Sequence, residues 1–143
     1  MKIDWVIPCR YVEVNENLAT IIGAGGDRFV LLEEPWMVEI MLAIRVTALV
    51  EELGPDKVHP VENSIRDPDG NVIHEESGSF AATARGDVHD PTWLQGVFIA
   101  AQAKFAAEIE GTYTVSHAFG GSEHLLPLHI SHGAAAGGEP NIL

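Results

Sequence analysis

Residues 36–50 read WMVEIMLAIRVTALV, and this stretch decides the fold class of the protein. Its even positions, Trp36 through Val50, are all apolar, whereas its odd positions mix charged, small and apolar side chains. Side chains of a β-strand alternate between two faces, so the pattern predicts a strand with one continuous apolar face. On a helix the same pattern would bury Glu39 and Arg45 among apolar neighbours. Strands usually have about 5–6 residues, so we expect this one to be bent or bulged and to cross the domain.

Shorter extended segments with turn signals between them precede and follow this strand. They lie at residues 3–8, 11–14, 18–22, 28–32, 58–66, 72–82, 97–105, 112–119 and 122–130. About 7–8 strands and at most one short helix are expected. Helix-forming residues in 100–110 predict that the strand at 97–105 ends in a tight corner, helical or extended. The pattern predicts an all-β, antiparallel sandwich.

Two turns have specific sequence signals. Asp67-Pro68-Asp69-Gly70 matches the residue preferences of a type I turn and predicts a hairpin in which Ile65 faces Ile73. Gly120-Gly121 supplies the positive φ values of a two-residue hairpin loop. Asp67 and Gly70 are therefore predicted to have structural roles.

Residues 105–113 read FAAEIEGTY and resemble the corner of an immunoglobulin-type sandwich. In that corner a tyrosine just after a glycine bonds its hydroxyl to the preceding backbone. The resemblance implies an immunoglobulin-like fold, with Gly111 and Tyr113 as its structural residues. Val115 stands where antibody domains have their second cysteine, so the resemblance is to the wider immunoglobulin-like class.

The chain as a whole resembles a bacterial family of unknown function with a small β-sandwich fold. The matching features are the opening strand, the Gly-rich turn at 23–26, the IRDPDGNVI hairpin, the F-x-x-E-x-E-G-T-Y corner and the final hairpin. Cys9-Arg10-Tyr11 departs from that family, which tends to have small residues there. The resemblance implies a fold and no activity.

Length and composition limit the function classes. The 143 residues suit one domain, predicted at 1–131 with a flexible C-terminal tail at 132–143. The net charge of −13 opposes binding to nucleic acid or to anionic membranes. A single cysteine, Cys9, and the absence of a signal-like N-terminus or an apolar span favour a cytoplasmic protein.

His117 and His124 are the candidate metal ligands. With Gly120-Gly121 as a two-residue loop they face each other across the final hairpin, close enough to share a zinc or nickel ion. A complete site needs a third and a fourth ligand, which the sequence does not supply, so a polar cross-strand pair is the alternative. Residues 23–28 lack the spacing of a dinucleotide-binding loop, and residues 77–79 lack the context of a nucleophile elbow. No catalytic residue and no cofactor are predicted.

The outer face of the long strand carries the predicted interface residues Met37, Glu39, Met41 and Arg45. Such mixed outer faces are common where a second subunit covers a sheet, and we favour a subunit interface here; the alternative is a strand buried on both sides within one chain. The leading hypothesis is a non-enzymatic interaction or structural module in a homo-oligomer or larger protein assembly. The alternatives are a small-ligand or carbohydrate-binding sandwich using Trp93 and Tyr11, and a metal-dependent enzyme built on the histidine pair.

Overall fold

The computed structural model describes residues 1–84, 86 and 90–133, and these residues form an all-β protein. The strands are β1 (Lys2–Cys9), β2 (Tyr11–Asn15), β3 (Leu18–Ile22), β4 (Arg28–Leu31), β5 (Met37–Leu49), β6 (His59–Arg66), β7 (Val72–Phe80), β8 (Leu94–Ala106), β9 (Gly111–Phe119) and β10 (Ser122–His132). A single 3-10 turn, η1 (Val50–Glu52), follows β5. The predicted count of 7–8 strands is too low, because a bend at Arg10 separates β1 from β2 and the two strands enter different sheets.

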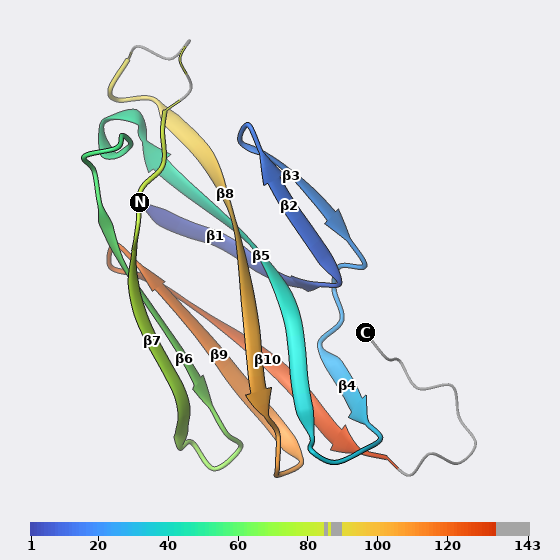
Figure 1. Ribbon diagram of the computed structural model, residues 1–143. Coiled ribbons are helices and arrows are strands. Elements are labelled where there is room, and N and C mark those ends of the chain that lie inside the picture. Colours follow the sequence, from blue (N-terminus) through green and yellow to red (C-terminus); the bar gives the residue numbers. More distant parts are fainter. Residues whose placement is uncertain (85, 87–89, 134–143) are drawn as a thin grey trace.

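Three sheets are present in the described residues (Figure 1). The smaller main sheet has the order β1-β5-β8, and the larger has the order β4-β10-β9-β6-β7. The hairpin β2-β3 forms the third. All pairings are antiparallel except that of β4 with β10, which is parallel.

The long strand predicted from the alternating pattern is β5, the centre of the smaller sheet. It pairs with β8 over 13 residues without a register shift, and the one irregularity in its pairing with β1 lies between Ile3 and Trp5. The strand β8 stays extended to Ala106, so helix propensity in 100–106 is overridden by continuous pairing with β5.

The turn at residues 67–70 and the corner that contains Gly111 and Tyr113 contact each other at one end of the molecule. Gly70 donates its backbone N–H to the Asp67 carbonyl at 3.0 Å, which closes the turn between β6 and β7. A Cβ added to Gly111, at the start of β9, would lie 2.9 Å from the ring of Pro68. The prediction that Ile65 faces Ile73 is wrong: a bulge after Ile65 shifts the register and places His74 opposite it.

Tyr113 makes the hydrogen bonds of the corner that its sequence resembles. Its hydroxyl donates to the Ile109 carbonyl at 2.9 Å and accepts from the Ile109 N–H at 3.3 Å. The side chain is fully buried and its ring packs 5.2 Å from that of Phe105. The corner therefore ties the start of β9 to the chain that leaves β8.

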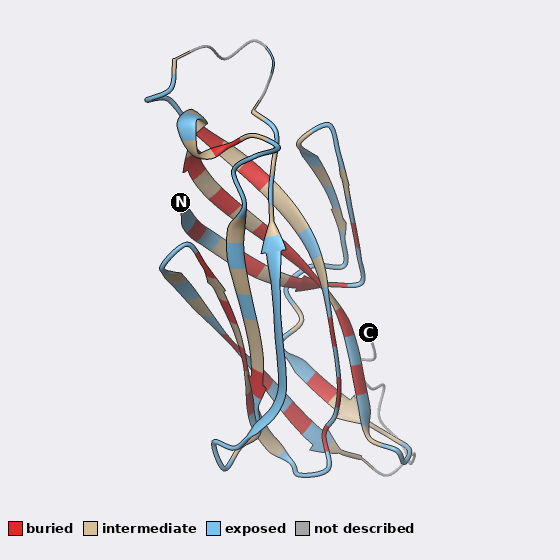
Figure 2. Cartoon of the chain, turned by 60° about the vertical axis from the view of Figure 1, so that its left-hand side comes forward, coloured by how far each residue is buried: buried red, intermediate tan, exposed pale blue. Residues whose placement is uncertain are grey.

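The hairpin β2-β3 lies over the outer face of the smaller sheet and partly covers it (Figure 2). Val12 of the hairpin packs on Cys9 and Ala43, and all three are buried. Met41, one of the predicted interface residues, packs against the same cluster. For this part of the face, a layer of the same chain replaces the expected second subunit.

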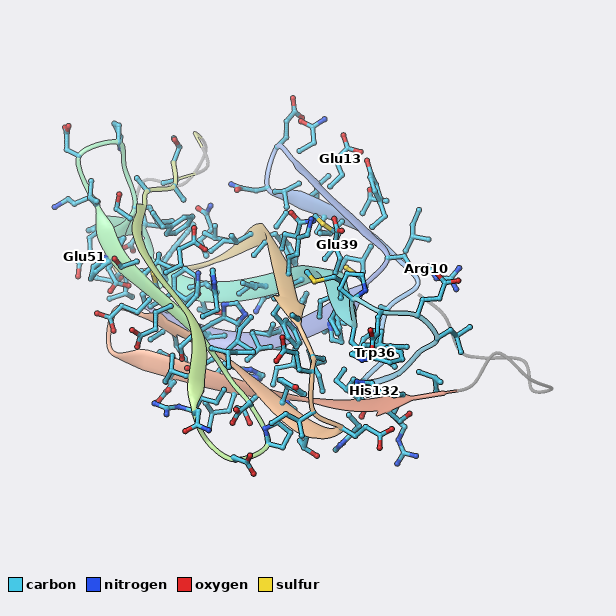
Figure 3. The ribbon with its side chains drawn as sticks, turned by 60° about the horizontal axis from the view of Figure 1, so that its bottom comes forward. Arg10, Glu13, Trp36, Glu39, Glu51 and His132 are labelled. Atoms are coloured by element: carbon cyan, nitrogen blue, oxygen red, sulfur yellow. The ribbon has the colours of Figure 1, made fainter. Side chains whose placement is uncertain are left out.

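Trp36 and His132 stack beside the end of β10, with ring centroids 4.1 Å apart and planes 9° from parallel (Figure 3). Nε2 of His132 also lies 2.7 Å from the Ala107 carbonyl. His132 thus belongs to β10, although the sequence assigned it to the tail. Gly133 follows within the described residues, and residues 134–143 of the predicted tail lie outside them.

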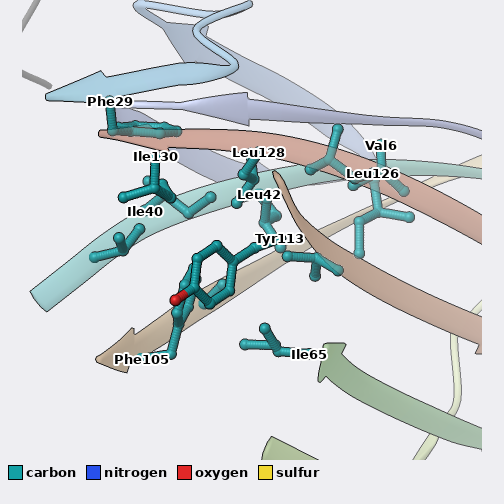
Figure 4. Packing of buried hydrophobic residues seen from close by; sticks show 14 of the residues in the cluster. Val6, Phe29, Ile40, Leu42, Ile65, Phe105, Tyr113, Leu126, Leu128 and Ile130 are labelled. Carbon is teal, nitrogen blue, oxygen red and sulfur yellow. The ribbon is translucent and has the colours of Figure 1, made fainter. Parts of the chain in front are cut away.

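The core lies between the two main sheets, and one cluster contains buried residues from both (Figure 4). Leu42 and Ile40 of β5 face Leu128 and Ile130 of β10 in this layer, next to Tyr113. Within the described residues no helix has the length and hydropathy of a membrane span.

Candidate functional site

The histidine pair is in the predicted register. His124 on β10 is the direct partner of His117 on β9, and Ser122 is the partner of Phe119. The two-glycine loop fixes this pairing, because a two-residue turn leaves no freedom in the register of its hairpin. Both histidines occupy positions that alternate with outward-facing residues, so both face the interior.

His117 is a buried, neutral histidine with one free nitrogen. Its Nδ1 lies 2.7 Å from Oδ1 of Asn63, to which it donates, and its Nε2 is buried without a partner. Burial, followed by the charge on nearby His124, lowers the pKa of His117 from 6.5 to about 4. Nδ1 of His124 is likewise buried and bonds no group among the described residues.

These two nitrogens are the donor set that a metal would use. Zinc in proteins normally has three or four protein ligands. The described part of the chain contains no group of three or more His, Cys, Asp or Glu side chains able to hold a metal. Each histidine could therefore contribute one bond, but the structure does not complete a metal centre around them.

A groove opens beside this pair, between β8 and the inner face of β6 and β7. It has two connected hollows of about 200 and 400 Å³, which share Asn63, Glu76, Ala101 and His117. The smaller hollow is mainly apolar, and its lining includes Ile44, Val61, Phe80, Ile99 and Phe119. The larger one has a mixed polar and apolar lining that includes His74, Gln102 and Lys104.

The register explains why Glu76 points into the groove. Glu76 pairs with Asn63, whose side chain reaches the interior to bond His117. Neighbouring positions on paired strands share a face, so Glu76 and Asn63 lie on the same side. Every residue of β7 except Phe80 is exposed (Figure 2), because no strand of the smaller sheet lies over it.

The edge of β8 beside the groove has little of the usual protection against pairing. Sheet edges are commonly protected by charged residues, proline, bulges or short length. In 13 residues β8 has one charged side chain, Lys104, and neither proline nor a register shift. The other main-sheet edges differ: β1 has a bulge and Pro8, β7 has Glu75 and Glu76, and β4 has 4 residues.

The predicted interface residues are only partly accessible. Met37 and Glu39 are exposed near one end of β5, and Glu39 accepts a hydrogen bond from Gln102 at 2.7 Å. Arg45 forms an ion pair with Asp4 and lies over Gly96. Met41 packs under the hairpin, so the four side chains do not form one open surface.

The aromatic residues proposed for ligand binding lie on separate elements. Tyr11 begins β2 and bonds Glu13 at 2.9 Å, and Trp93 immediately precedes β8. Both are about half exposed or more, and neither lines the groove.

Sequence reasoning missed the groove itself. Its residues Asn63, Glu76 and Ala101 come from three strands and have no motif in common. One signal was present: residues 72–80 show no apolar alternation, which is typical of a strand exposed on both faces.

Comparison of the sequence with models of protein families and with curated proteins found no match. The resemblance to a bacterial family of small sandwich proteins therefore remains a prediction.

Proposed function

We propose that this chain is a non-enzymatic interaction module with an immunoglobulin-like sandwich fold, a subunit of a homo-oligomer or larger protein assembly. The observation that carries the proposal is the edge of β8, which has one charged residue and pairs with no further strand among the described residues, beside the exposed strand β7. An exposed edge of this length, with one charge in it, is a template for pairing with another chain.

The burial of β8 supports the same proposal. Its inward side chains Val97, Ala103 and Phe105 are buried, whereas Ile99 and Ala101 between them are only half-buried. The smaller sheet has three strands and the larger sheet has five, so the smaller sheet ends first, at β8. The apolar layer between the two sheets is therefore open along the edge of β8. Further apolar burial is available to any strand that adds there.

The fold part of the proposal has its own support. Three features are compatible with an immunoglobulin-like arrangement. They are the Tyr113 corner, the two facing sheets, and the parallel pairing of the short early strand β4 with the last strand, β10. We also propose a cytoplasmic location, which the single cysteine favours.

Native mass spectrometry of the untagged protein at neutral pH tests the proposal. A discrete oligomer whose mass is a multiple of the bare chain would show a homo-oligomer, and a bare monomer would leave assembly with a different protein. Two variants show whether an oligomer uses the edge of β8. Ala101→Arg places a charge in the groove and should dissociate such an oligomer, whereas Ala100→Arg is a matched change on the outer face of β8 and should not. Turnover of a substrate by a bare monomer would contradict the proposal.

A metal site at His117 and His124 is the second candidate, favoured by two facing histidines that each bury a free nitrogen. If it is correct, Zn²⁺ or Ni²⁺ raises the melting temperature of the wild-type protein, since a ligand that binds only the native state stabilises it. His124→Ala would abolish that increase and His129→Ala would retain it. An unchanged melting temperature of the wild-type protein rejects the candidate.

A further inference from the structure

Among the described residues no strand pairs with β8 on the side opposite β5, so this edge offers backbone hydrogen-bonding groups to an added strand. Neighbouring strands lie about 4.8 Å apart, so an added strand would lie directly over the inner face of β6 and β7. The two hollows of about 200 and 400 Å³ occupy that space. The groove therefore has the position to hold one extended segment.

The side chains of the groove differ along its length. Alternate residues of an added strand point inward, so one would enter the apolar hollow beside Val61, Ile99 and Phe119. A residue two or four positions away on the same face would meet Glu76, next to Asn63. An apolar residue fits the first position and a cation fits the second.

We propose that this groove binds an extended segment of a partner protein, which adds to β8 as a fourth strand of the smaller sheet. The segment has an apolar side chain for the hollow at Ile99 and a Lys or Arg, on the same face, for Glu76. This inference rests on the proposed function as an interaction module and specifies the class of partner.

The charge of the chain favours a basic segment. The net charge is −13, and Glu75 and Glu76 lie next to each other on β7, one on each face. Complementary charge raises the association rate and selects among partners. Lys104, the single cation in β8, lies 3.9 Å from Glu39 and is therefore partly neutralised.

A second copy of the chain fits the groove less well. Antiparallel pairing of β8 with β8 of another copy uses a two-fold axis perpendicular to the sheet. Both five-stranded sheets would then lie on the same side of the joined sheet. Because β7 reaches past β8, the β6-β7 pairs of the two copies would compete for the same space.

A displayed library of random peptides as long as β8, selected on the immobilised full chain, provides the test. We expect the enriched peptides to alternate apolar residues with others and to have Lys or Arg two or four positions from an apolar residue. A synthetic peptide of the leading sequence is then titrated by fluorescence anisotropy. In its complex, backbone amides of β8 should exchange more slowly with deuterated solvent.

Two variants with matched controls localise the binding. Ala101→Trp fills the groove and should weaken peptide binding about tenfold or more, whereas Ala100→Trp, on the outer face, should not change it. Glu76→Gln should weaken binding about two- to fivefold, as expected for an exposed ion pair, and Glu75→Gln should have no effect. Glu76 is exposed on an edge strand, so its variant reports on binding even if Ala101→Trp fails to fold.

The inference is overturned if no peptide is enriched, if the enriched peptides show no alternation, or if their affinity is unchanged by both Ala101→Trp and Glu76→Gln. It is also overturned if Ala101→Trp dissociates a native homo-oligomer, because the occupant is then a second copy. In that case the proposed function still holds. If the protein is a monomer and no peptide is selected, both the peptide-binding inference and the proposed function are rejected.

Discussion

His117 and His124 face each other across β9 and β10, and each buries a ring nitrogen that bonds no described group of the protein. A buried polar atom without a partner costs stability, and a buried charge costs more. His117 bonds Asn63 through its other nitrogen, and burial, followed by the charge on His124, lowers the pKa of His117 and keeps the ring neutral. The pair therefore makes the stability of the fold depend on pH.

We expect His117 to destabilise the protein as the pH falls. Its pKa is about 4 in the native state against 6.5 ordinarily, so below pH 6.5 the unfolded chain takes up a proton that the native chain does not. The loss grows from about pH 6.5 to about pH 4, reaches about 3 kcal/mol and then levels off. Urea unfolding measured across this pH range should show that the free energy of unfolding falls less steeply for His117→Gln, because glutamine does not titrate.

His129→Gln is the control for this experiment. His129 lies on the outer face of β10, exposed and bonded to Thr112 at 2.9 Å. Its variant should keep the wild-type pH dependence. Equal slopes for wild type and His117→Gln would show that His117 is not the group responsible.

Tyr113→Phe should lower the free energy of unfolding by about 1–2 kcal/mol. The change removes the hydroxyl that bonds both the N–H and the carbonyl of Ile109, in a fully buried position. Chemical denaturation measures the difference. Tyr11→Phe is the matched control, because that hydroxyl bonds only Glu13 in an exposed position, and its removal should have little effect. Equal losses for the two variants would contradict a structural role for the corner.

Gly111→Ala should destabilise the protein by about 1–3 kcal/mol. Gly111 has φ +138, which alanine rarely adopts, and the new Cβ would lie 2.9 Å from Pro68. Gly78→Ala in β7 is the control, since its added Cβ would meet no atom within 4 Å. Thermal unfolding should show a lower melting temperature for the first variant only. An unchanged melting temperature for Gly111→Ala would mean that the turn at Pro68 moves away without cost.

The sequence predicted those parts of the fold that depend on local chemistry. The alternation in 36–50 gave β5, because a two-residue period belongs to a strand alone. The two-glycine loop gave the partnership of His117 with His124, because a tight turn fixes register. The hydrogen bonds of Tyr113 were expected from the short segment around it. In each case the deciding residues are close in sequence.

The sequence did not predict what covers each face. Alternation shows that Met41 and Ala43 lie on the outer face of β5, but not that the β2-β3 hairpin folds onto them. The register of Ile65 was missed because a bulge leaves no clear sequence signal. The groove was missed for a similar reason: it forms where five strands extend past three, which depends on the order of strands in both sheets.

The cover formed by the β2-β3 hairpin gives a final prediction, based on the single cysteine. Cys9 is 1% exposed beneath Val12, and burial raises the pKa of its thiol, so we expect slow labelling by a water-soluble disulfide reagent in the native protein. Val12→Ala removes about 1–2 kcal/mol of packing and should raise the labelling rate about 5–30-fold through local opening of the hairpin. Thr20→Ala, on the exposed face of β3, should leave the rate unchanged. Wild-type labelling as fast as that of the unfolded chain would show that the hairpin does not stay on the sheet, and the outer face of β5 would again be open to a second subunit.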